Sequence, residues 1–174
     1  YKRQSHVNVG DVVVGREFIQ HDMDATPLFP RYEVPLSRVA RFAADPALSD
    51  ALVNAARLAV QDMLSSLPRS EWLNLDLNNV QIHQGLIASG DRFVSQTGES
   101  QILQNELPDA LAVEMECAAM AQVCHDYGVP LAAVRIISDR ANDKAHVDFS
   151  RFIQAIASRY SVSVLDRLLS QLPV

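Results

Sequence analysis

The chain has 174 residues, of which 48% are hydrophobic and 21% charged, a composition typical of a globular protein rather than a disordered one. This length suits one domain with a substantial core, and no apolar run is long enough to span a membrane. The net charge of -6 argues against nucleic-acid binding, which needs clustered Lys and Arg. Cys117 and Cys124 lie on one predicted helix, too far apart to bridge, and indicate free thiols in a reducing cytosol.

The first part of the chain predicts a strand, a loop and a helix. The β-branched run Val12–Val14 is typical of a strand. Three prolines in the segment 27–35 favour an extended loop. Asp45 then predicts a helix N-cap with Pro46 at the first helical position, and apolar residues keep a helical period to about Leu64.

The middle of the chain begins with a polar stretch and returns to regular structure. The segment Ser65–Asn79 holds Pro68 and Trp72, and we interpret it as an excursion from the core. A strand is expected over Val80–Ile87. A short helix is expected over Glu99–Glu106.

The last part continues this alternation. Residues Met115–Tyr127 predict a helix that Gly128 closes, and the apolar segment Pro130–Ile137 predicts a strand. A last helix is expected from Asp148. The apolar stripe of that helix comprises Phe152, Ile153, Ile156, Ala157, Tyr160, Val164 and Leu168. Strands that alternate with helices predict a layered α/β fold.

Acidic residues follow two of the apolar segments. Glu114 comes directly after the apolar residues 110–113, and Glu116 follows two positions later. Asp139 follows the segment Pro130–Ile137 after one intervening residue. Because ligands of open α/β sheets bind at the carboxyl ends of strands, two such acids can act on one small molecule. One acid would be ionised and stabilise positive charge, and the other would be protonated and donate. Acids also cap helix N-termini, and spacing alone leaves that structural role open.

Arg135 interrupts an otherwise apolar segment. A buried guanidinium costs several kcal/mol unless it is paired, so Arg135 should have a carboxylate partner. Glu114 and Asp139 are the candidates. The pattern indicates a structural ion pair.

Three sequence blocks resemble a known family when they occur together. They are Ile87-Ala-Ser-Gly-Asp-Arg-Phe93, Ala112-Val-Glu-Met-Glu-Cys-Ala-Ala119 and Val134-Arg-Ile-Ile-Ser-Asp139. They resemble the purine nucleosidase and phosphorylase superfamily, in particular its 5′-methylthioadenosine/S-adenosylhomocysteine nucleosidases. The resemblance implies a three-layer α/β/α fold with a central mixed sheet, nucleoside phosphorylase-like, as a single domain over residues 1–174. It also implies that the family's first strands, with a water-activating carboxylate, precede the position of Tyr1.

The resemblance implies catalytic roles for two of the acids. Asp139 would protonate N7 of the departing purine. Glu116 would stay ionised, accept hydrogen bonds from the ribose hydroxyls and stabilise the oxocarbenium-like cation. Ser138 would orient the Asp139 carboxyl, although a plain helix cap is an alternative role for it.

The resemblance implies further substrate contacts. Phe93 would stack on the base, with the backbone of Val94 at the purine edge. Met115 would pack under the sugar, and Phe149 would line the pocket for the 5′-alkylthio group. Glu114 resembles a second glutamate of the family site. The apolar residues Phe93 and Met115 also suit ordinary core positions.

The predicted function is hydrolysis of the N-glycosidic bond of 5′-methylthioadenosine, S-adenosylhomocysteine or a related adenine nucleoside. A phosphorylase and a non-catalytic nucleoside-binding domain are the alternatives. No metal-ligand spacing and no Gly-rich phosphate loop occurs, so we expect no metal and no cofactor. In related nucleosidases the region that corresponds to the loop 27–35 packs across a two-fold axis, so we expect a homodimer; the alternative is that the loop folds onto its own subunit. The thiols indicate a cytoplasmic protein, and the charge and the lack of a long apolar run predict no nucleic-acid or membrane partner.

Overall fold

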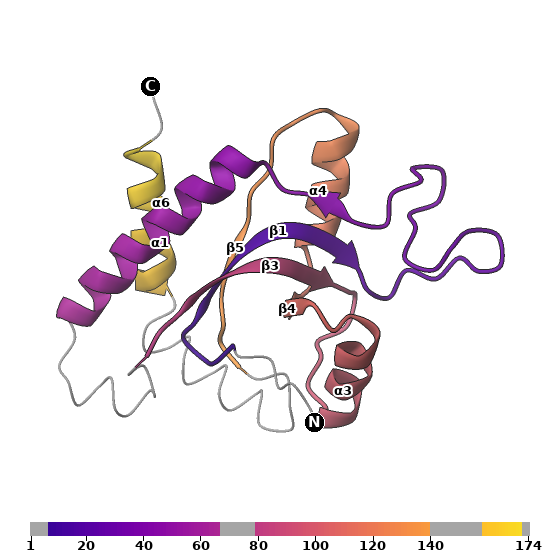
Figure 1. Ribbon diagram of the computed structural model, residues 1–174, viewed down its shortest axis with the longest axis horizontal. Coiled ribbons are helices and arrows are strands. Elements are labelled where there is room, and N and C mark those ends of the chain that lie inside the picture. Colours follow the sequence, from indigo (N-terminus) through magenta and orange to yellow (C-terminus); the bar gives the residue numbers. More distant parts are fainter. Residues whose placement is uncertain (1–6, 67–78, 140–157, 172–174) are drawn as a thin grey trace.

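The computed structural model describes residues 7–66, 79–139 and 158–171. Its elements, in chain order, are β1 (Val12–Gln20), β2 (Phe42–Ala43), α1 (Pro46–Ser66), β3 (Ile82–Ser89), α3 (Thr97–Glu106), β4 (Ala110–Glu114), α4 (Cys117–Asp126), β5 (Val134–Ile136) and α6 (Ser158–Leu169). Figure 1 shows a curved sheet with α1 and α6 on one side and α4 on the other. The expected three-layer α/β/α architecture is confirmed.

The five-stranded sheet is mixed. Its main order is β2-β1-β3-β4, and β5 also pairs with β1. β3 is parallel to β1 and to β4, whereas β2 and β5 are antiparallel to β1. In the register, Gln20 pairs with Ser89, and Ser89 pairs with Glu114. The carboxyl ends of three strands therefore meet at one edge of the sheet.

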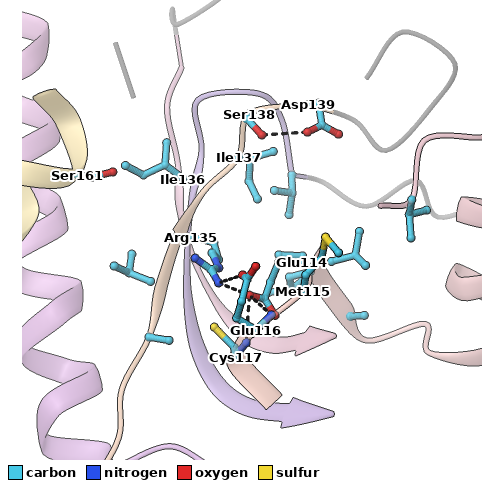
Figure 2. Close-up of a pocket in the computed structure, with 18 of the residues that line it drawn as sticks. Glu114, Met115, Glu116, Cys117, Arg135, Ile136, Ile137, Ser138, Asp139 and Ser161 are labelled. Atoms are coloured by element: carbon cyan, nitrogen blue, oxygen red, sulfur yellow. Dashed lines mark hydrogen bonds and ion pairs between the residues drawn. The ribbon is translucent and has the colours of Figure 1, made fainter. Parts of the chain in front are cut away.

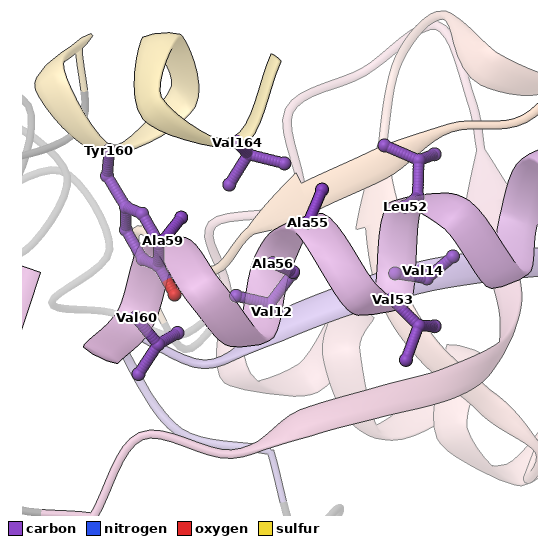
Figure 3. Close-up of a cluster of buried hydrophobic side chains, with 10 residues drawn as sticks. All are labelled: Val12, Val14, Leu52, Val53, Ala55, Ala56, Ala59, Val60, Tyr160 and Val164. Carbon is purple, nitrogen blue, oxygen red and sulfur yellow. The ribbon is translucent and has the colours of Figure 1, made fainter. Parts of the chain in front are cut away.

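β1 forms the centre of the core because helices cover both of its faces. Val12 and Val14 pack with α1 and α6, as Figure 3 shows. Val13 lies in a second cluster with Phe18, Ile87 and the buried side of α4. All three valines are fully buried, as expected of a strand covered on both sides. The predicted strand over Val12–Val14 is confirmed, and pairing with β3 extends it to Gln20.

The helix α1 begins where the sequence predicts. Oδ1 of Asp45 accepts a hydrogen bond from the backbone N–H of Leu48 at 2.8 Å, which caps the first turn. Pro46 opens the helix, where its missing N–H costs nothing. On the buried side α1 packs against Tyr160 and Val164 of α6, two residues of the predicted apolar stripe. Small buried side chains in α1 let the elements approach closely, and these are Ala55, Ala56 and Ala59.

Other boundaries differ from the predictions by a few residues. β3 covers Ile82–Ser89 rather than Val80–Ile87, because its pairing with β1 continues to Ser89. α4 begins at Cys117 rather than Met115, because the Glu114 carboxylate accepts the backbone N–H groups of the helix start. Gly128 follows α4 with φ of 64°, the left-handed conformation that ends a helix.

The segment 27–35 is a loop, as predicted, and Arg31 within it pairs with Glu106 of α3 at 2.7 Å. No helix among the residues that the structure describes is long and apolar enough to cross a membrane. Most of the polar excursion at 65–79, the start of the last helix at Asp148, and Phe149 lie outside the described residues.

Candidate active site

Glu114, at the end of β4, is the centre of a charged cluster. Its side chain is 11% exposed. Oε1 accepts hydrogen bonds from the Ser89 hydroxyl and from the backbone N–H of Cys117, the latter at 3.0 Å. Oε2 accepts from the backbone N–H of Glu116 at 3.1 Å and from the Arg135 guanidinium (Figure 2). The cluster joins β3, β4, β5 and the N-terminus of α4.

These contacts set the protonation of two side chains. Burial opposes ionisation of Glu114, but hydrogen bonds from Ser89, Arg135 and the Cys117 backbone outweigh it and lower the pKa of Glu114 from 4.5 to about 2. Glu114 is therefore a carboxylate at neutral pH. Burial raises the pKa of the Cys117 thiol to about 12, so that thiol is protonated and unsuited to be a nucleophile.

Arg135 reaches from β5 to two carboxylates. One of its terminal nitrogens, Nη2, donates to Oε2 of Glu114 and to Oε2 of Glu116, the latter at 3.0 Å. Glu116 is 65% exposed and stands at the open side of the cluster. The prediction that Arg135 has a carboxylate partner is confirmed: Glu114, one of the two candidates, is a partner, and Glu116 is a second partner that the sequence did not indicate.

Asp139 follows β5 and is oriented by its neighbour. The Ser138 hydroxyl donates to Oδ2 of Asp139 at 2.9 Å. Because β5 is antiparallel to β1, its carboxyl end lies beside the start of β1, where the Gly10 N–H donates to the Ile137 carbonyl at 2.8 Å.

The rule that ligands bind at the carboxyl ends of parallel strands therefore applies to Glu114 but not to Asp139. Glu114 ends a parallel pair of strands, and Asp139 follows an antiparallel one. Arg135 of β5 donates to Glu114 at the end of β4, whereas Ser138 and Asp139 lie apart from this cluster, as Figure 2 shows, and line the same cleft.

One open cleft of about 1380 Å³ contains the cluster. The candidate residues that line it are Phe93, Val94, Glu114, Met115, Glu116, Ser138 and Asp139. Sites for small molecules usually occupy roughly 300–1,000 Å³, so the cleft has room for a nucleoside and extends beyond it. The extension is apolar and runs toward α1 and α6, where Leu52 and Val164 form part of the wall.

Phe93 and Met115 are exposed at this cleft rather than buried in the core. An exposed aromatic ring offers a stacking surface, and an exposed thioether offers adaptable apolar contact. Val94 beside them is buried. In the described parts of the chain, no group of three or more His, Cys, Asp or Glu side chains could hold a metal ion.

Ser89 is a site residue that the sequence reasoning missed. It is fully buried, and its hydroxyl donates to Glu114 while it accepts the Ala118 backbone N–H at 2.8 Å. The sequence did contain an indication of this role, because Ser89 is a polar residue directly after the apolar run Leu86–Ala88. Spacing alone did not show its partner, which lies 25 positions further along the chain.

Comparisons with known proteins agree with this geometry. The model of the phosphorylase superfamily matches residues 4–170. A 5′-methylthioadenosine/S-adenosylhomocysteine nucleosidase of Anoxybacillus flavithermus is 34% identical over 87% of this chain and 57% of its own length. The solved nucleosidase of the same name from Neisseria meningitidis, in complex with methylthio-immucillin-A, is 34% identical, with a TM-score of 0.78 over 96% of this chain and 64% of that one.

A more distant solved structure is the futalosine hydrolase of Helicobacter pylori, which is 26% identical, with a TM-score of 0.74 over 95% of this chain and 62% of that one. The chain spans about three fifths of the length of the relatives that it matches. The resemblance drawn from three sequence blocks is confirmed by both kinds of comparison. The chain belongs to the phosphorylase superfamily.

Proposed function

We propose that this protein hydrolyses the N-glycosidic bond of 5′-methylthioadenosine, S-adenosylhomocysteine or a related adenine nucleoside and releases adenine. The observation that carries the proposal is one cleft that combines the acids Glu116 and Asp139 with the exposed apolar side chains of Phe93 and Met115. Relatives that are 33–34% identical are named as nucleosidases for two of these substrates, which supports the same chemistry here.

Asp139 serves the leaving group in this proposal. Adenine leaves with the bonding electrons, so N7 of the purine must gain a proton or a strong hydrogen bond as the bond lengthens. The Ser138 hydroxyl donates to one oxygen of Asp139 at 2.9 Å and so orients the carboxyl group. A fixed donor of this kind acts without reorganisation at the moment of reaction.

Glu116 serves the sugar. The ribose becomes an oxocarbenium-like cation as adenine departs, and a nearby carboxylate stabilises that charge. Glu116 is well exposed at the cleft and accepts a hydrogen bond from Arg135 at 3.0 Å. A carboxylate offers about four acceptor positions, so Glu116 can accept hydrogen bonds from ribose hydroxyls in addition to the one from Arg135.

Apolar contacts hold the substrate. Phe93 stacks on the purine, the backbone of Val94 meets the purine edge, and Met115 packs under the sugar. The exposure of Phe93 and Met115 at the cleft supports these roles. Phe149, which lies outside the described residues, is expected to complete the pocket for the 5′-group.

Water rather than phosphate is the proposed nucleophile. A phosphate site needs several cations, which bind its oxygens through charge-assisted hydrogen bonds. Among the described residues that line the cleft, Arg135 is the only Lys or Arg, and it is paired with Glu114 and Glu116. Relatives that are 33–34% identical are named as nucleosidases, which favours a hydrolase over a phosphorylase.

The nucleophile is tested by incubating the full-length protein with methylthioadenosine, with and without phosphate, and identifying the sugar product. Free methylthioribose under both conditions is expected. A ribose 1-phosphate product formed only with phosphate would identify a phosphorylase, and no release of adenine would identify a binding domain. Asp139→Asn should lower kcat by about 10²–10⁴-fold, the usual contribution of a general acid.

We also infer that the protein is a homodimer assembled through the loop 27–35. Leu28 in this loop is 85% exposed and Leu36 just after it is 90% exposed. Large exposed apolar side chains that gather on one loop are a feature of surfaces that meet a partner. The loop of one subunit would cover the 5′-end of the substrate in the other.

A further inference from the structure

The charges of the cluster do not cancel. Arg135 donates through Nη2 to both Glu114 and Glu116, so one guanidinium is shared by two carboxylates. With both acids ionised the three side chains carry a net charge of about -1. The position of that residual charge depends on which carboxylate neutralises Arg135.

The two carboxylates differ in how they are held. Glu114 is 11% exposed, whereas Glu116 is 65% exposed. The oxygens of Glu114 accept from the Ser89 hydroxyl, from the backbone N–H groups of Glu116 and Cys117, and from Arg135. These contacts occupy the roughly four acceptor positions of a carboxylate, so Glu114 has no capacity left for a ribose hydroxyl.

We propose that Glu114 is a positioning residue that neutralises and fixes Arg135, so that the carboxylate of Glu116 is oriented by the guanidinium yet keeps its negative charge for the sugar. This inference rests on the proposed nucleosidase function of the same cleft. It gives Glu114 a role through other residues instead of a contact with the substrate.

Burial explains why Glu114, rather than Glu116, neutralises Arg135. Interactions between charges strengthen as water is excluded, and Glu114 is the most buried of the three side chains. Without the charge of Glu114, Arg135 would pair with Glu116 alone, and the cluster would be neutral. Loss of the net negative charge would raise the energy of the transition state, in which the sugar becomes positive, more than it would weaken substrate binding.

Ser89 helps to hold the Glu114 carboxylate in place. Its buried hydroxyl ties Glu114 to the backbone of Ala118 in α4, and the Glu114 carboxylate in turn caps that helix at Cys117. The carboxylate also keeps its charge throughout the neutral range, since its pKa is lowered to about 2.

The main test compares two variants of the full-length protein. Glu114→Gln keeps the shape of the side chain and should lower kcat for methylthioadenosine by about 10²–10³-fold, the range for loss of one preorganised electrostatic group. The dissociation constant for free adenine should stay within about twofold, because the proposed binding mode places the base against Phe93 and Asp139. The double variant Glu114→Gln/Arg135→Met removes the unbalanced cation and should recover at least about tenfold in kcat relative to Glu114→Gln.

A matched control breaks a similar ion pair outside the cleft. Arg41 binds Asp109 through two hydrogen bonds of 2.6 and 3.2 Å, and neither residue lines the cleft. Asp109→Asn should leave kcat unchanged. Thermal unfolding of every variant separates loss of fold from loss of function.

If Glu114→Gln does not fold, Ser89→Ala supplies the test. Removing this donor loosens the hold on the Glu114 carboxylate, so kcat should fall while the dissociation constant for free adenine stays within about twofold. A purely structural role would lower the thermal unfolding temperature without separating kcat from adenine binding in this way.

Three results would overturn the inference. They are wild-type kcat in Glu114→Gln, a double variant no faster than the single one, or wild-type kcat in Ser89→Ala. Failure of the proposed function itself would show in the wild-type protein, which would then release no adenine from methylthioadenosine.

Discussion

At the scale of single residues, the ionisation of Glu114 links the cleft to the stability of the fold. Burial opposes its charge, but its hydrogen bonds lower its pKa from 4.5 to about 2. A carboxyl with a lowered pKa in the folded state stabilises the protein above its unfolded pKa. That contribution is lost as the pH falls through the folded pKa. The difference between 4.5 and about 2 corresponds to about 3 kcal/mol.

Glu114→Gln should therefore cost unfolding free energy at pH 7 but little near pH 2. The stability gap between wild type and variant should narrow progressively between about pH 5 and pH 2, because wild type loses its advantage as Glu114 is protonated. Urea unfolding at several pH values measures both proteins. A gap that stays constant with pH would show that Glu114 stabilises the fold by packing alone.

Gly90 permits a close approach of two loops. A Cβ on Gly90 would lie 2.2 Å from Nε2 of His21, so alanine would force the imidazole ring to move. Gly90→Ala should cost about 1–3 kcal/mol of unfolding free energy, the usual range for overpacking. Adding His21→Ala should remove most of this penalty, because the clashing ring is then absent.

The control for Gly90 is Gly98, where a Cβ would meet no atom within 4 Å. Gly98→Ala should be neutral or stabilise by up to about 1 kcal/mol, through reduced freedom of the unfolded chain. Chemical unfolding of the two single variants and the double variant measures these effects. Equal effects at the two glycines would contradict the explanation by contact.

At the scale of elements, the packing of α1 on the sheet depends on its buried side. Leu52 lies in the core cluster with Val12 and Val14 of β1, whereas Leu58 on the same helix is exposed. Leu52→Ala should cost about 2–5 kcal/mol of unfolding free energy, since it leaves a cavity. Leu58→Ala, the control, should cost much less, and urea unfolding distinguishes the two.

At the scale of the whole molecule, the proposed dimer makes the loop 27–35 part of two subunits. Leu28→Ser should weaken association and raise the Michaelis constant for methylthioadenosine, while free adenine binds as before. Leu169→Ser changes another exposed leucine, on α6, and should alter neither property. Light scattering that found a fully active monomer in the wild-type protein would contradict this arrangement.

The sequence by itself determined the local structure and the family. Asp45 and Pro46 located the start of α1, and Gly128 located the end of α4, because caps and left-handed residues act over a few neighbouring positions. The three sequence blocks implied the layered fold and a common site. The structure brings those blocks to one cleft.

Only the tertiary structure decided how the charges of that cleft are connected. The partner of Ser89 lies 25 residues away and that of Arg135 lies 21 residues away, so hydrophobic period and capping rules carry no information about either contact. The antiparallel course of β5 is likewise a matter of pairing between distant segments. Local patterns specify which residues are polar at strand ends, whereas the choice of partners follows from how the strands cross and which charges are buried together.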